Sequence, residues 1–436
     1  MNLSRVVAYN TFIQILGKGI TVIFGITTTA LLTNYLGAGG FGNYTFALSF
    51  VAIFSSIADW GTVLISVKEA SRSVNQQDKI FGNTLLLRFF LSIIATIAVW
   101  IIIFLFPLKT IHQESLRSLV IFSSILILIF SLKTSLEIVF QTKLKQQKTA
   151  LVEWTASFLT LILSFTIIKI GGDLFLIVSG LILANIVATV LAFILANQLS
   201  SIDFSISKSI LKTISLQALP MGGVLILYSV YNRADSLILQ AFGGSETVGV
   251  YGLSYRVYEV IVLGAFYLMN SILPIISQEQ DKTRFRQIYQ KTLDILILAG
   301  GFVFLGTLIF APLAIKIIAW QKPVEFSQSI PLLRILGLAA FISYLNHLTG
   351  YTVVVLGKQV KYLLIALVAL IFNFSLNLIL IPKFSFYAAA WLTVLTEGLV
   401  FCLTSILLVK TMGFLPNFFS FPKTAWQILM KKGKIF

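Results

Sequence analysis

Six charged residues lie inside long apolar segments, where they could act on ions or on a charged substrate. Arg233, Asp235 and Arg256 lie in stretches that are otherwise apolar. A charge at the centre of a bilayer costs about 2.5–3.5 kcal/mol on insertion scales, and charges kept there mark substrate or ion pathways. The candidates among the deep charges are Lys18, Asp59, Arg233, Asp235, Arg256 and Glu397; Glu259, which is also deep, is the expected partner of Arg256. These residues are therefore the candidates for binding a charged substrate.

Several charges also have a purely structural interpretation. Arg256 and Glu259 are three residues apart, so they would pair on one helix face. Arg233 and Asp235 are two residues apart and point in different directions, so each needs a partner on another helix or contact with water. Glu397 would be either a protonated acid in a helix–helix hydrogen bond or a functional group. Five charges near the ends of apolar runs are expected to reach out to water, namely Arg88, Glu137, Glu153, Asp294 and Arg334.

The composition places the chain among integral membrane proteins. Hydrophobic residues make up 58% of the sequence, charged residues only 11%, and the mean hydropathy is +0.95. A soluble domain has about 25% charged residues. The single cysteine, Cys402, excludes an intrachain disulfide and suggests no metal cluster. The sequence contains no Ser-His-Asp order, His-Glu-x-x-His motif or nucleotide-binding glycine loop, and no loop between apolar runs exceeds about 20 residues. A membrane transporter is expected, without a cofactor, and not an enzyme.

The apolar runs predict an all-α protein of about twelve transmembrane helices. A spanning helix needs about 20 mostly apolar residues. Breaker residues such as Gly171-Gly172-Asp173 separate neighbouring runs. The predicted spans are 11–36, 44–66, 83–106, 118–140, 150–169, 174–197, 216–240, 250–276, 292–319, 330–356, 361–381 and 388–409.

The distribution of lysine and arginine predicts that both termini are cytoplasmic. With the N-terminus placed in the cytoplasm, 21 of the 32 basic residues fall on that side, 6 fall on the other side and 5 lie inside spans. Lys133 is counted with the cytoplasmic group. Because cytoplasmic loops of membrane proteins carry an excess of lysine and arginine, this orientation is favoured. The net charge of +16 is then mostly a consequence of topology, and no nucleic-acid partner is indicated.

Two similar turns, half a chain apart, suggest that the chain consists of two homologous halves. Gly37 to Tyr44 and Gly243 to Tyr251 have the same form, with one residue inserted in the second. Six spans in each half is an even number, so the two bundles would run in parallel, with the substrate between them near the midplane. The predicted division is an N-terminal bundle at 1–200, a C-terminal bundle at 201–413 and a basic amphipathic tail at 414–436 on the membrane surface.

The order of several short motifs along nearly the whole chain points to a known family. They are Leu36-Gly37…Phe41-Gly42-Asn43-Tyr44, Asp59-Trp60-Gly61, Val248-Gly249-Val250-Tyr251, Asn373…Asn377 and Ala388-Ala389-Ala390-Trp391. With these motifs the chain resembles polysaccharide-biosynthesis flippases of the O-antigen (Wzx-type) group in the MOP exporter superfamily. One departure is Phe384 to Ala388, where the family often has a glycine-containing turn.

The resemblance implies two parallel six-helix bundles around a cationic central cavity. It implies an oligosaccharide on a polyprenyl diphosphate as substrate, moved to the outer leaflet of a bacterial inner membrane for lipopolysaccharide synthesis. Arg233, Arg256 and Lys18 would bind the diphosphate, because arginine suits phosphate bidentately. Asp235 and Asp59 would position these cations or bind a coupling ion, H⁺ or Na⁺. Membrane lipids, a glycan polymerase and glycosyltransferases would be partners.

Two alternatives stay open at the level of sequence, and a third is disfavoured. A multidrug or organic-cation exporter of the related MATE type would need an excess of acid in its cavity, and the deep charges here are mixed. A flippase for lipid-linked peptidoglycan precursor is a close relative. A membrane glycan polymerase or ligase usually carries a large outer loop, and the outer loops here are short.

Overall fold

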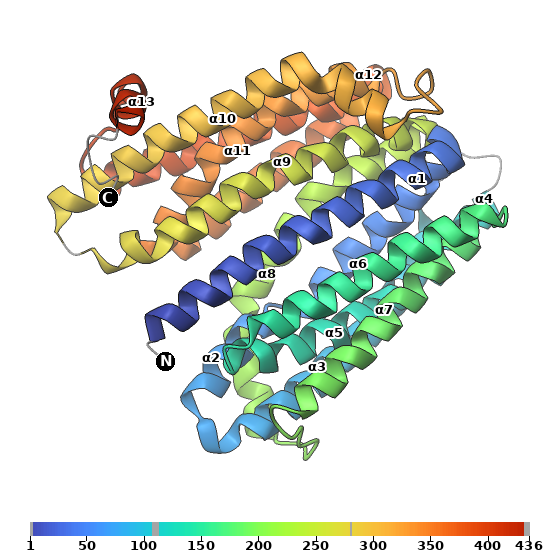
Figure 1. The fold of residues 1–436 in the computed structure, drawn as a ribbon, viewed down its shortest axis with the longest axis horizontal. Helices are drawn as coiled ribbons and strands as arrows, with labels where there is room; N and C mark the ends of the chain where they lie inside the picture. Colours follow the sequence, from blue (N-terminus) through green and yellow to red (C-terminus); the bar gives the residue numbers. More distant parts are fainter. Residues whose placement is uncertain (1–2, 107–112, 280, 431–436) are drawn as a thin grey trace. The chain divides into compact units, whose positions relative to one another are not determined.

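The computed structural model describes residues 3–106, 113–279 and 281–430, and every regular element in these ranges is helical (Figure 1). In chain order the helices are α1 Leu3–Asp59, α2 Thr62–Arg72, a 3₁₀ turn Val74–Gln76, α3 Gln77–Leu105, α4 Gln113–Ser123, α5 Ile125–Thr142, α6 Gln146–Lys169, α7 Leu174–Asn197, α8 Lys208–Gly243, α9 Ser245–Gln278, α10 Lys282–Ile318, α11 Ser329–Val355, α12 Gln359–Met412 and α13 Phe421–Leu429. The all-α prediction is confirmed.

Three long helices contain breaks. In α1 the break is at Gly37, whose φ of 66° lies in the left-handed region that glycine adopts without strain. In α12 it is at Ser385, with a φ of 51°, inside the segment where the sequence departs from the family pattern. The helix α8 bends by 49° between Lys208–Pro220 and Gly222–Gly243. Proline causes such a bend because it lacks the amide hydrogen and its ring clashes with the preceding turn.

These breaks reconcile the helix count with the predicted number of spans. Nine helices of the described chain are long and apolar enough to cross a membrane, or ten when the bent α8 counts as one span. The helices α1 and α12 have 57 and 54 residues and a non-helical residue between two long parts, so each comprises two membrane-length segments. The described residues therefore contain twelve apolar helical segments, as the sequence predicts.

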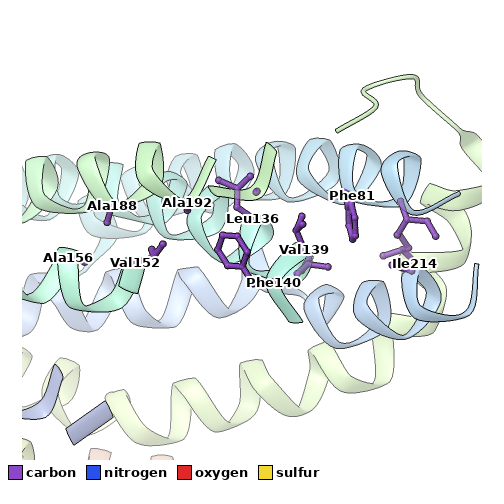
Figure 2. Packing of buried hydrophobic residues seen from close by; sticks show 13 residues of the cluster. Phe81, Leu136, Val139, Phe140, Val152, Ala156, Ala188, Ala192 and Ile214 are labelled. Carbon is purple, nitrogen blue, oxygen red and sulfur yellow. The ribbon is translucent and has the colours of Figure 1, made fainter. Parts of the chain in front are cut away.

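The chain forms two compact units, Met1–Gly249 and Val250–Phe436. The core of the first unit gathers apolar side chains from α3, α5, α6, α7 and α8 (Figure 2). Phe140 of α5 is fully buried in it, while Ala188 and Ala192 of α7 let neighbouring helices approach closely. The sequence-based division at 200–201, with a tail from 414, remains a prediction.

The second unit has its own core between α9, α10, α11 and α12. Buried side chains such as Met269, Leu296, Leu348 and Leu408 form it. Small residues again set the helix spacing: a Cβ atom on Gly337 of α11 would lie 2.0 Å from the Thr307 hydroxyl of α10. Because lipid is as apolar as these side chains, close van der Waals packing holds such helices together.

The two repeated turns of the sequence pack against each other within the first unit. A Cβ atom on Gly42 would lie 1.7 Å from the carbonyl oxygen of Ser245, and one on Gly249 would lie 2.0 Å from that of Ala38. The contact is reciprocal, because equivalent glycines of the two turns each face the backbone of the other. Ser245 also donates a hydrogen bond to Asn43. The glycines are therefore required for a backbone-to-backbone helix crossing.

Asp294 of α10 fastens the segment after α12 instead of reaching water. Its carboxylate accepts hydrogen bonds from Ser420 at 2.6 Å, Thr424 at 2.5 Å and Gln290 at 3.1 Å. Asp294 is almost fully buried, so the expectation that its side chain reaches out to water is wrong. The helix α13, which begins at Phe421, is held to α10 by this network. The predicted tail residues 431–436 lie outside the described residues.

The predicted orientation can be tested with single cysteines in a Cys402→Ser background. Cysteines at Gln146 and Gln287 are expected to react only with a membrane-impermeant reagent added from the cytoplasmic side, because positive charges surround both positions. A cysteine at Glu246 is expected to react only from outside; Glu246 is exposed, whereas the neighbouring Ser245 is engaged with Asn43. Labelling of any of these positions from the opposite side would refute the predicted topology.

Candidate functional site

Asp59 and Arg88 form a buried ion pair at a break in the helical chain between α1 and α2. Trp60 and Gly61 have φ values of 49° and 68°, which ends the helix directly after Asp59. Arg88 of α3 donates to the Asp59 carboxylate at 2.8 Å, to Thr62 at 3.1 Å and to Thr134 at 2.5 Å. Only 2% of the Arg88 side chain is exposed. The expectation that Arg88 reaches water is wrong, because the helix break presents it with the Asp59 carboxylate and the Thr62 hydroxyl, and α5 adds the Thr134 hydroxyl.

Lys18 lies beside a second group of charges. Its ammonium is 3.7 Å from one carboxylate oxygen of Glu153 on α6, and the ammonium of Lys133 on α5 is 3.8 Å from the other. Lys133 is also 3.4 Å from the side-chain oxygen of Asn185 on α7. Lys133, which the sequence analysis placed at the cytoplasmic side, is buried between helices instead. Lys18 differs from it, because 41% of its side chain is exposed.

Glu137 is near enough to both ion-pair groups to interact with their charges. It is one helical turn from Lys133 on α5, and only 8% of the residue is exposed. Its Oε1 atom has no hydrogen-bond partner in the part of the chain that the structure describes. Glu153, Lys133, Arg88 and Lys18 all act on it electrostatically. The expectation that Glu137 reaches out to water is therefore also wrong.

Arg233 and Asp235 of α8 differ in burial, as their spacing predicts. Asp235 is 3% exposed, whereas Arg233 is only half-buried. Residues two apart on a helix are about 200° apart around its axis, so one faces the protein interior when the other faces outward. The two residues therefore have separate surroundings in the first unit.

The candidate residues of the second unit have partners of their own. Arg256 donates to Glu259 at 3.2 Å on the same helix, which confirms the predicted pairing, and its side chain stays 49% exposed. Asn346 of α11 donates to the Glu397 carboxylate at 2.6 Å and to the Glu397 backbone carbonyl at 2.9 Å. Glu397 thus takes part in the helix–helix hydrogen bond that was one of its two predicted roles.

Two candidate residues of the first unit form ion pairs with residues outside the candidate set. Asp59 pairs with Arg88, and Lys18 pairs with Glu153. The sequence analysis did not select Arg88, Lys133, Glu137 or Glu153; the spacing of Lys133 and Glu137, one turn apart in an apolar run, was the available signal. Within the described residues, no group of three or more His, Cys, Asp or Glu side chains could hold a metal ion.

Comparison with solved structures shows a shared fold. The chain is similar to a MATE-family multidrug transporter in an inward-facing conformation (TM-score 0.74, 15% identity, covering 90% of this chain and 95% of that one). It is similar to the lipid II flippase MurJ in an inward closed conformation (TM-score 0.75, 13% identity, covering 95% and 96%). A third similar structure is the MATE multidrug transporter DinF-BH (TM-score 0.67, 18% identity, covering 94% and 96%).

Family models identify the chain at the level of sequence. A MatE model matches residues 220–379. No curated protein sequence matches the chain. A model described as polysaccharide biosynthesis protein matches residues 7–280, which is more than half of the 436 residues. The chain, a multi-pass membrane protein with the fold of MOP-superfamily transporters, belongs to the polysaccharide biosynthesis protein family.

Proposed function

We propose that the protein is a lipid-linked oligosaccharide flippase, which moves polyprenyl-diphosphate-linked glycan units from the cytoplasmic to the outer leaflet by alternating access. One observation carries the proposal: five basic side chains within the membrane-length helices differ in their burial. Arg88 and Lys133 are buried against carboxylates, whereas Lys18, Arg233 and Arg256 stay accessible. The accessible cations are the ones that an anionic head group can reach.

The chemistry of the substrate explains why accessible cations are needed. A diphosphate is strongly anionic, and transferring an unpaired charge into hydrocarbon is very costly. Lysine and arginine at membrane depth lower this barrier by ion pairing, and arginine adds two parallel hydrogen bonds to phosphate oxygens. The lipid tail can stay in the bilayer while the head group moves.

The six candidate residues then have different roles. Lys18 and Arg233 of the first unit, and Arg256 of the second, each bind the diphosphate at some stage of transport. Asp59 acts through Arg88, whose position it holds, and Asp235 stabilises the helix next to Arg233. Glu397, through Asn346, positions α11 against α12 in the second unit. Transport is coupled to an H⁺ or Na⁺ gradient, in a bacterial inner membrane, with both termini cytoplasmic. Glycosyltransferases supply the substrate and a glycan polymerase consumes the product.

A MATE-type exporter of organic cations is the second candidate, favoured by the MatE match over residues 220–379 and by the fold. The two functions need opposite charge at the binding site. Proteoliposomes loaded with either a fluorescent polyprenyl diphosphate glycan or a fluorescent organic cation would distinguish them, because a flippase should move only the anionic lipid.

Replacing Arg233 with alanine tests the flippase proposal. Hydrogen bonds to charged groups contribute about 1.5–3 kcal/mol, so loss of one bidentate contact should slow transport by about ten- to hundredfold. Arg233→Lys should retain part of the rate, because the charge remains without the planar fork. Transport is measured in proteoliposomes holding equal amounts of folded protein, as the fraction of labelled lipid that reaches the outer leaflet.

Arg334→Ala is the matched control. Arg334 is likewise an arginine on an apolar helix and is more exposed than Arg233, but its Nε donates to the Leu308 carbonyl at 3.0 Å, which indicates a structural role. Wild-type transport by Arg334→Ala, together with slow transport by Arg233→Ala, supports the proposal. Equal, unimpaired transport by both variants would remove Arg233 from the substrate path.

A further inference from the structure

Glu137 is a buried carboxyl group that the proposed transport cycle leaves unexplained. It is more than nine-tenths buried, and its Oε1 atom has no hydrogen-bond partner among the described residues. An ionised carboxylate in this position would be costly, since a buried charge needs pairing and hydrogen bonds to both oxygens. A protonated carboxyl avoids most of that cost. The position is therefore built for a group that can gain and lose a proton.

The charged groups around Glu137 come from several helices packed against α5. Lys18 comes from α1, Arg88 from α3 and Glu153 from α6, while Lys133 is on α5 itself. The Lys133 ammonium, one turn away on the same helix, already contacts Glu153 at 3.8 Å and Asn185 at 3.4 Å. The Arg88 guanidinium is taken by Asp59 at 2.8 Å. Each of these cations thus contacts an acid other than Glu137: Lys18 and Lys133 share Glu153, and Arg88 pairs with Asp59.

Counting charges shows what a proton on Glu137 would do. Lys18, Lys133 and Arg88 supply three positive charges, and Asp59 and Glu153 supply two negative charges. With Glu137 ionised the cluster is neutral, and with Glu137 protonated it carries one net positive charge. A site with net positive charge attracts an anion more strongly, so the protonation state of Glu137 sets the affinity of this region for anions.

Lys18 belongs both to the group of charges around Glu137 and to the accessible cations that are proposed to bind the diphosphate. Its ammonium contacts Glu153 while 41% of its side chain is exposed. When an anionic head group binds Lys18, it adds negative charge beside the cluster. The surroundings of Glu137 then become less positive, which favours its neutral form.

We propose that Glu137 is a proton-binding site, and that a proton on Glu137 and an anionic diphosphate on Lys18 each strengthen the binding of the other. The step is a simple protonation: one proton from solution binds a carboxylate oxygen of Glu137, and no other bond changes. Because binding equilibria at two sites are reciprocal, the diphosphate must take up protons to the same extent that protons increase its affinity. The coupling part of this proposal rests on the proposed function; the proton site does not.

Infrared difference spectroscopy on the purified protein tests the proton site without any substrate. A protonated carboxyl has a C=O stretching band that an ionised one lacks. We expect such a band near neutral pH, its loss at alkaline pH, and its absence from Glu137→Gln. The control Glu114→Gln, which changes an exposed acid on α4, should retain the band. Retention of an unchanged band in Glu137→Gln, or no titrating band in the wild type, would overturn the proposal. The absence of a titrating band from the wild type would overturn the proposal even where a variant does not accumulate.

Binding of a diphosphate tests the coupling. The probe is geranylgeranyl diphosphate in detergent, with affinity measured from about pH 6 to about pH 9, across the range where neither lysine nor arginine titrates fully. A unit charge about 10 Å away, at an effective dielectric constant of about 20, changes binding by roughly tenfold. We therefore expect the ratio of Glu137→Gln to wild-type affinity to rise about tenfold with pH. The ratio cancels the ionisation of the diphosphate itself, which both proteins share.

The outcomes separate the two proposals. A constant affinity ratio at all pH values, with diphosphate bound by both proteins, would overturn the coupling and leave the flippase intact. Absence of diphosphate binding by both proteins would count against the flippase, and the infrared band would still decide whether Glu137 binds a proton. Proton uptake on diphosphate addition, seen with an indicator dye in weak buffer for wild type and not for Glu137→Gln, would confirm both.

Discussion

Gly42→Ala is expected to prevent the protein from accumulating in folded form. The added methyl carbon would lie 1.7 Å from the Ser245 carbonyl oxygen and 2.9 Å from the Gly249 amide nitrogen. These atoms belong to the backbone, so no side-chain rotation relieves the clash, and the two helices must separate. Overpacking a tight site costs about 1–3 kcal/mol when side chains can adjust. Here we expect more than about 3 kcal/mol, a loss that few single substitutions reach.

Three glycine variants make this prediction specific. Gly249→Ala should be as damaging as Gly42→Ala, because its methyl carbon would lie 2.0 Å from the Ala38 carbonyl oxygen. Gly39→Ala, one turn before Gly42, should be tolerated, since its nearest contact is an ordinary 3.7 Å to Glu246. Membrane abundance and the midpoint of thermal unfolding in detergent measure the effect. A Gly42→Ala protein that unfolds at the wild-type temperature would mean that the two turns do not pack as described.

Arg88→Met is expected to destabilise the first unit by about 3 kcal/mol. Removing one partner of a buried ion pair typically costs about 3–5 kcal/mol, because the other partner is left uncompensated. Asp59 keeps some exposure, at 30% of its side chain, so the lower end applies. Thr62 and Thr134 would also lose their hydrogen bonds to the guanidinium. The free energy of unfolding, followed in detergent by tryptophan fluorescence, measures the loss.

Lys18→Met is the matched control for Arg88→Met. It also removes a cation of an ion pair, but the Lys18–Glu153 pair is partly exposed on both sides, and such pairs contribute about 1 kcal/mol or less. Asp59→Asn combined with Arg88→Met should restore part of the lost stability, since the orphaned charge disappears with its partner. A double variant that is no more stable than Arg88→Met would show that Arg88 stabilises the protein through the threonines alone. Equal stability of Lys18→Met and Arg88→Met would refute the structural role of Arg88.

The helical class, the apolar segments and the local pairings could all be predicted from the sequence. Runs of about 20 apolar residues leave only helices as a way to satisfy the backbone in lipid. Gly37 marked the first break. The repeat of its turn near Gly243 suggested two homologous halves, but the contact at Gly42 and Gly249 became clear only from the structure. The Arg256–Glu259 pair was also predictable, because residues three apart share one helix face.

Which of the deep charges are buried, and which partner each one has, became clear only from the packing of the helices. The pairs Arg88–Asp59 and Lys133–Glu153 join separate helices. Such a pair depends on the rotation of each helix about its axis and on its height relative to its neighbour. A uniformly apolar helix surface carries little information about either quantity, since lipid and protein interior are equally apolar. The position of Glu137 near two ion pairs therefore follows from helix packing and not from its place in the sequence.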